Sequence, residues 1–183
     1  MVCAAAAVAA DGSVLWSEEA ALGAARHEIA LVLRQDGATG RESLAYADVI
    51  SGIALDGVLD VRVQIGYSTG STNPSFLRIE IRAADWKIPS GDITVRFPGS
   101  LVKLNGRGGS AAEGDDVVAS VQVSRGVDAL KSPARELSGG TVILRVGMSD
   151  KSWLDIPVPA LLFKRSFTLS SGELTSLRAA KGL

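Results

Sequence analysis

The sequence predicts an all-β fold: a single antiparallel β-sandwich or flattened barrel of about eight strands, with a short C-terminal helix. Three observations support this prediction. Apolar and polar residues alternate with a period of two through much of the chain, glycine-rich turns separate the alternating segments, and 183 residues with 46% hydrophobic content suit one domain. Such alternation is typical of antiparallel sheets, which have one buried face and one solvated face.

The first ten residues have two interpretations. Residues 1–10 read MVCAAAAVAA and resemble the apolar end and small-residue cleavage site of a secretory signal peptide. No Lys or Arg precedes Arg26, so the positively charged start of such a leader is missing. The segment is therefore either a signal-peptide remnant or an N-terminal arm, and its alanines also suit an N-terminal helix. Residues 11–183 are the single sandwich domain. The first interpretation predicts an extracytoplasmic protein, periplasmic or secreted.

Six segments show the alternation expected of strands. In Val58–Ile65, for example, Leu59, Val61, Val63 and Ile65 share one face. The six segments are His27–Arg34, Val58–Ile65, Ser75–Arg82, Asp92–Phe97, Val117–Ser124 and Thr141–Met148.

The segments between the strands differ in what they predict. Gly139-Gly140 supplies residues that tolerate positive φ and favours a turn. The Gly-, Ser- and Ala-rich stretch Gly106–Gly114 is interpreted as a mobile loop. Val127–Leu137 has helical character, but Pro133 limits it to a turn or two.

A C-terminal helix is predicted over residues 171–181. Ser170 and Glu173 have the spacing of a capping box, in which the serine hydroxyl accepts the backbone N–H three residues on. Leu174, Leu177 and Ala180 then recur every three residues and form a narrow apolar stripe. We expect this stripe to close the core.

Composition excludes several classes of function. Nineteen basic and twenty acidic residues give a net charge of −1, with no basic cluster, so a nucleic-acid partner is not expected. No apolar run approaches the roughly 20 residues of a membrane span. Cys3 is the single cysteine and His27 the single histidine, which rules out an internal disulfide and a thiolate zinc site. We predict no metal and no cofactor.

Two features raise the question of catalysis. Gly66-Tyr67-Ser68-Thr69-Gly70 matches the G-x-S-x-G nucleophile elbow, which requires a strand turning directly into a helix. Here another strand is predicted after the loop, and His27 precedes the serine. We interpret the motif as a strand–loop–strand connection and His27 as a strand-end histidine bonded to the backbone. No catalytic residue is predicted.

Aromatic residues near strand ends are the candidate binding residues. A Trp ring at a strand end can anchor a protein partner or stack on a sugar, or it can plug the open end of a sandwich. We name Trp86, Trp153 and Tyr67 as candidates for contact with a ligand or partner.

The part of the chain from Trp86 onward resembles a family of small exported bacterial proteins, the invasion-associated locus B family. The resemblance rests on Trp86-x-Ile88-Pro89-x-Gly91, on Gly140–Val146, and on Ser166–Leu169 before the terminal helix. It implies a secreted β-sandwich without catalytic residues.

The function we expect from the sequence is therefore non-enzymatic: an exported sandwich that binds a protein or an envelope component, with self-assembly included. The alternative is a structural subunit of a virion, a phage tail or a surface appendage. A serine hydrolase that uses Ser68 is the third hypothesis.

Overall fold

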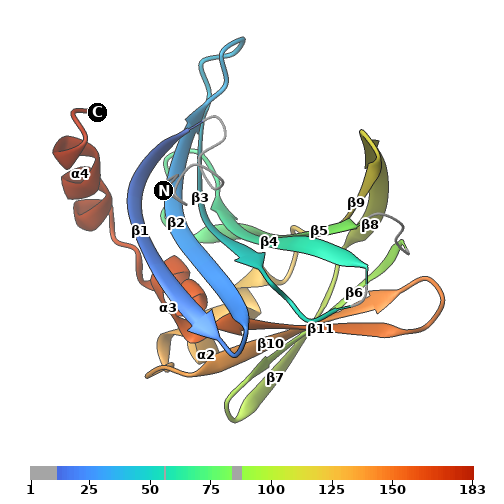
Figure 1. The fold of residues 1–183 in the computed structure, drawn as a ribbon. Helices are drawn as coiled ribbons and strands as arrows, with labels where there is room; N and C mark the ends of the chain where they lie inside the picture. Colours follow the sequence, from blue (N-terminus) through green and yellow to red (C-terminus); the bar gives the residue numbers. More distant parts are fainter. Residues whose placement is uncertain (1–11, 56, 84–87) are drawn as a thin grey trace.

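The computed structural model describes residues 12–55, 57–83 and 88–183, and it confirms the predicted β-sandwich. In these residues, eleven strands form two antiparallel sheets that pack against each other (Figure 1). The number of strands exceeds the predicted eight or so, and the described strands form two open sheets and not a closed barrel. The strands are β1 (Ser13–Leu22), β2 (Ala25–Gln35), β3 (Glu42–Ser51), β4 (Val58–Tyr67), β5 (Pro74–Ala83), β6 (Pro89–Phe97), β7 (Ser100–Asn105), β8 (Arg107–Glu113), β9 (Asp116–Val123), β10 (Thr141–Met148) and β11 (Trp153–Pro159).

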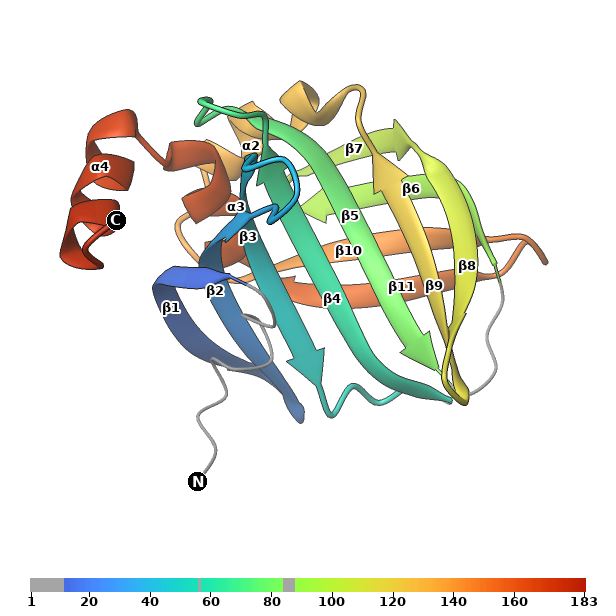
Figure 2. The ribbon, with the colours of Figure 1, turned by 90° about the horizontal axis from the view of Figure 1, so that it is seen from above.

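The larger sheet has seven strands in the order β1-β2-β3-β4-β5-β9-β8, and the smaller sheet has four in the order β11-β10-β6-β7. The first five strands follow one another across the larger sheet. The chain then crosses to the smaller sheet for β6 and β7, returns for β8 and β9, and crosses again for β10 and β11. Figure 2 shows the larger sheet in front, with its strands running at a steep angle to those behind. Every strand pairs with neighbours that lie antiparallel to it.

The core lies between the sheets, on the faces that the alternation predicts. In β4, Val61, Val63 and Ile65 are fully buried. Leu59 was expected on the same face but is 52% exposed. The register with β5 shifts between Val58 and Asp60, and this irregularity turns Leu59 out of the core.

The stretch Gly106–Gly114 is not a mobile loop, because most of it forms β8, an edge strand of the larger sheet. The prediction was wrong because β8 has the sequence RGGSAAE, which contains no large apolar residue. Most of the strand is exposed, so no alternation is needed there. Its pairing with β9 is what makes it a strand.

Three short helical segments close one end of the sandwich. The 3₁₀ helix η1 (Val127–Leu130) and α2 (Lys131–Arg135) are as brief as Pro133 predicts. The helix α3 (Ala160–Thr168) was not predicted. It buries Phe163 completely against the core, and the ring of Phe163 meets that of Phe97 edge to face at 5.4 Å.

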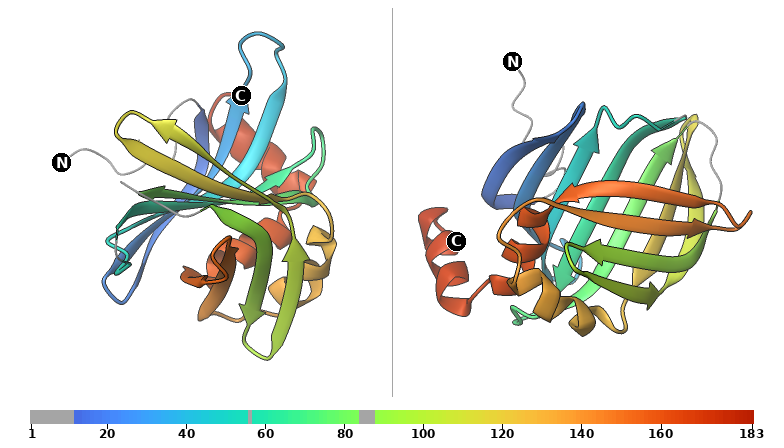
Figure 3. Two further views of the ribbon diagram at one scale, coloured as in Figure 1. Left: turned by 90° about the vertical axis from the view of Figure 1, so that its right-hand side faces the viewer. Right: turned by 90° about the horizontal axis from the view of Figure 1, so that it is seen from below.

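The predicted C-terminal helix is confirmed as α4 (Ser171–Ala180), and the Ser170 hydroxyl accepts the Glu173 N–H at 3.1 Å. However, no residue of α4 is fully buried. The helix stands beside the sandwich in the right-hand view of Figure 3. Its Leu174 and Leu177 are only partly covered. The expectation that α4 closes the core was wrong, since α3 occupies that place.

Residues 1–10 and Trp86 lie outside the described residues, so the signal-peptide and arm interpretations stay predictions. Within the described part of the chain, no helix is long and apolar enough to cross a membrane.

Candidate functional site

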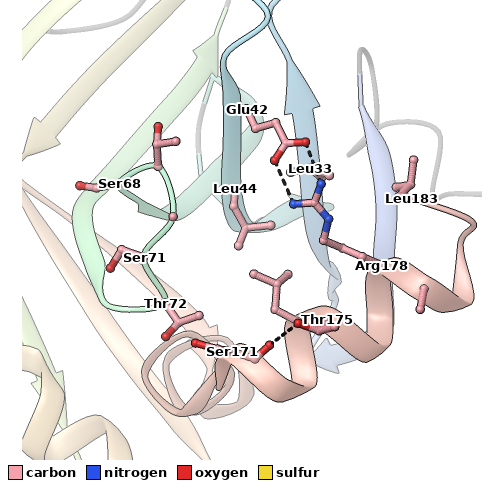
Figure 4. Close-up of a pocket in the computed structure, with 14 residues that line it drawn as sticks. Leu33, Glu42, Leu44, Ser68, Ser71, Thr72, Ser171, Thr175, Arg178 and Leu183 are labelled. Carbon is pink, nitrogen blue, oxygen red and sulfur yellow. Dashed lines mark hydrogen bonds and ion pairs between the residues drawn. The ribbon is translucent and has the colours of Figure 1, made fainter.

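A groove of about 420 Å³ separates α4 from the larger sheet (Figure 4). Leu33 at the end of β2 and Leu44 on β3 contribute its apolar surface on the sheet side. Leu174 of α4 contributes on the helix side. The groove therefore joins three segments that are far apart in the sequence.

Hydroxyl groups line the rest of the groove. They come from the loop between β4 and β5 on one side and from α4 on the other (Figure 4). The hydroxyl residues are Ser68, Thr69, Ser71, Thr72, Ser171 and Thr175. The Thr175 and Ser71 hydroxyls already donate to the carbonyls of Ser171 and Asn73. A hydroxyl oxygen has two acceptor positions, so the walls can still accept hydrogen bonds from a polar ligand.

One ion pair links α4 to the sheet and another links it to α3. Arg178 donates from both terminal nitrogens to the two carboxylate oxygens of Glu42, at 2.9 and 2.8 Å. These bonds lower the pKa of the Glu42 carboxyl, so Glu42 is ionised at neutral pH. Arg165 of α3 pairs with Glu173 at 2.9 Å. Because Arg178 and Glu42 neutralise each other, the charged side chains of the groove leave no net charge in it.

Ser68 lies on the rim of the groove, but the G-x-S-x-G motif does not form an elbow. The loop that contains it leads from β4 into β5 at Pro74, so strand, loop and strand follow one another as predicted. The single histidine is not beside it, because His27 is buried on β2 and pairs with Asp48.

His27 and Asp48 form a pair inside the core, where sequence analysis expected a histidine bonded to the backbone. His27 Nδ1 lies 2.8 Å from Asp48 Oδ2, and both side chains are completely buried. Among the described residues, His27 Nε2 and Asp48 Oδ1 have no hydrogen-bond partner. Burial raises the pKa of the Asp48 carboxyl, and the bond to His27 offsets part of this rise.

A signal for this pair was present in the sequence. Asp48 follows Leu44 and Tyr46 and precedes Ile50 at spacings of two, so it occupies an inward-facing position of β3. His27 shares the inward face of β2 with Ile29. Two polar residues at inward positions of adjacent strands predict a partnership, but their register only emerges from the paired strands.

The candidate aromatic residues do not come together. Tyr67 is 5% exposed and its hydroxyl donates to the Ser166 carbonyl of α3 at 2.8 Å, so it is a core residue and not a ligand contact. Trp153 is 55% exposed and therefore does not plug the sandwich. It begins β11, next to the β10–β11 hairpin tip, which lies at the opposite end of the sandwich from α3 (Figure 2).

A second hollow, of about 590 Å³, lies where β1 and β3 end and β2 begins. Glu28 lines it, is 8% exposed, and has a carboxylate oxygen with no partner among the described residues. Burial, followed by the charge of Glu19, raises the pKa of the Glu28 carboxyl. No three His, Cys, Asp or Glu side chains of the described ranges lie close enough together to hold a metal ion.

The raised pKa of Glu28 predicts a pH-dependent stability. The folded state holds a proton that the unfolded state has released, so stability is lost as pH rises through the folded-state pKa. Glu28→Gln removes this loss. We expect urea unfolding to show the stability of the variant rising relative to that of the wild type as the pH increases above about 4.5, the ordinary pKa of glutamate. Glu18→Gln, at an exposed position of β1, is the control and should follow the wild type throughout. If the difference in free energy of unfolding between Glu28→Gln and the wild type does not change with pH, the assignment is wrong.

Comparisons of the chain with family models, curated proteins and solved structures found no match. The resemblance to the invasion-associated locus B family therefore stays a prediction.

Proposed function

We propose that this chain is a non-enzymatic binding protein that holds an extended segment of a partner protein in the groove beneath α4. The observation that supports this most is the composition of the groove: leucines on its apolar surface, hydroxyls along both walls, and one ion pair that is internally satisfied.

This composition suits a polypeptide better than other ligands. An extended peptide presents backbone amides, which hydroxyl groups can bond as donors or acceptors, and apolar side chains, which the leucines can cover. The charged side chains of the groove cancel each other, so they give no favourable field to a nucleic acid or another polyanion. Its volume lies in the range of ordinary ligand sites.

The attachment of α4 also supports the proposal. The helix is held by partly exposed ion pairs and by half-buried leucines, whereas α3 is anchored by the fully buried Phe163. Elements with few buried contacts open at low free-energy cost, so α4 can adjust to a segment that enters the groove.

The test blocks the groove with a tryptophan side chain introduced on α4. Random linear peptides are displayed and selected on the immobilised full chain, and their affinities are then measured for variants. Thr175→Trp places an indole in the groove and is expected to weaken the selected peptides by about tenfold or more. Ser176→Trp is the matched control, because this neighbouring exposed residue of α4 does not line the groove, and it should bind like the wild type.

The proposal fails if no peptide is enriched, or if both tryptophan variants bind the selected peptides as well as the wild type. Export is a separate part of the proposal and rests on residues 1–10. N-terminal sequencing of the protein from its native cells tests it, since a retained Met1 contradicts cleavage.

A further inference from the structure

The four outer edges of the two sheets differ in how they are protected from pairing with another strand. Natural edge strands are blunted by bulges, charges or prolines. In β1 the register shifts between Val14 and Trp16, and two consecutive glutamates follow. In β11, Pro157 and Pro159 lack the N–H that a new neighbour needs. The edge strand β7 has Lys103 in its interior.

The edge strand β8 has none of these protections in its interior. Residues 108–112 are Gly, Gly, Ser, Ala and Ala, and six of the seven residues of β8 are exposed. Alternate residues of an edge strand direct their backbone N–H and C=O groups away from their one partner. The β8–β9 hairpin also stands at the far end of the larger sheet, as its ribbon in Figure 1 shows.

The two small residues at the start of β8 have different explanations. A side chain on Gly108 would overlap the carbonyl oxygen of Pro89, so glycine is required there by the chain's own packing. A Cβ on Gly109 would meet nothing within 4 Å. The chain's own packing therefore requires a glycine at 108 but not at 109.

The charges of β8 stand at its two ends and are self-complementary. Arg107 pairs with Gln122 and Glu113 with Asp116 in the β9 ladder, six residues apart on β8, so both side chains are on the same face. An antiparallel copy of β8 centred on Ser110 brings each Arg107 opposite the Glu113 of the other copy. Opposite charges at facing positions of an antiparallel pair are stabilising.

We propose that β8 pairs with β8 of a second copy of this chain, antiparallel and centred on Ser110. The two larger sheets then form one continuous sheet across a two-fold axis. This contact uses the same strand of both copies, so it closes at two subunits and gives a dimer, whereas a filament or tube requires a head-to-tail contact. The inference is independent of the groove beneath α4.

The test is a charge-reversal cycle followed by analytical ultracentrifugation. Arg107→Glu or Glu113→Arg alone places like charges opposite each other twice in the dimer, and each is expected to raise the dimer dissociation constant by about tenfold or more. The double variant restores both pairs and should return to near the wild-type value. Lys103→Glu reverses a charge on the β7 edge instead and should leave the dimer unchanged. Circular dichroism checks that each variant is folded.

A cross-link tests the register directly. In a Cys3→Ser background, Ser110→Cys faces its own copy across the two-fold axis, so oxidised glutathione is expected to convert most of the protein to a disulfide-linked dimer. Ala112→Cys faces Gly108 of the other copy and should cross-link far less. A wild-type chain that stays monomeric at high concentration overturns the proposal, as does an open series of larger oligomers. Equal cross-linking at both positions, or a dimer that both single reversals leave intact, overturns it as well.

Discussion

Asp48→Ala is expected to lower the free energy of unfolding by about 3–5 kcal/mol, one of the two largest effects predicted for this protein. The side chain is completely buried and pairs with His27 at 2.8 Å. Removing the carboxylate leaves an imidazole without a partner in the core, and the imidazole must then stay desolvated without compensation. Urea unfolding of the variant beside the wild type measures the loss.

Two further variants test whether the loss of stability comes from the unpaired imidazole or only from lost packing in the core. Replacing both residues, His27→Leu with Asp48→Leu, leaves no polar group unpaired and is expected to restore most of the stability, since apolar pairs often match buried ion pairs. Asp155→Ala breaks the exposed pair with Arg145 and should cost far less. Our assignment is wrong if Asp48→Ala costs less than about 1 kcal/mol, or if the double variant is as unstable as the single one.

Phe163→Ala is expected to destabilise the protein by about 3–5 kcal/mol, because it opens a cavity where α3 closes the sandwich. Its ring is fully buried and packs edge to face on Phe97 at 5.4 Å. The loss is measured by the midpoint and slope of urea unfolding, and an unchanged slope shows that the variant still unfolds from a compact native state.

Leu177→Ala provides the matched comparison on the other C-terminal helix. Leu177 packs against the core only in part, so its truncation is expected to cost about 1 kcal/mol or less. A loss as large as that of Phe163→Ala would mean that α4 also closes the core, which the sequence had suggested. A large loss for Phe163→Ala alone confirms that closure belongs to α3.

Strands and helix caps of this protein could be predicted from the sequence where neighbouring residues form a clear pattern. In Thr141–Met148, Val142, Leu144 and Val146 recur every two residues, and the segment forms β10 with these bounds. Ser170 lies three residues before Glu173, and it caps α4 as predicted. Both signals depend on neighbours within a few residues, so no distant part of the chain is needed to recognise them.

Elements without such a signal were missed. The strand β8 lacks large apolar residues and exists because β9 pairs with it. The helix α3 follows directly after β11, and its apolar residues are as compatible with a short buried strand as with a helix. Tyr67 was named as a candidate binding residue, whereas the carbonyl of Ser166, 99 residues away, accepts a hydrogen bond from its hydroxyl in the core.

The sequence by itself determined the class of the fold, most of its strands, the cap of its last helix and the absence of a strand–helix elbow at Ser68. Only the tertiary structure decided the partnership of His27 with Asp48, the groove that joins Leu44 to Arg178, and the edge position of β8. The physical reason is the range of the interactions: alternation and capping act between near neighbours, whereas register, crossovers and edges depend on which distant strands pair, and no local pattern specifies that choice.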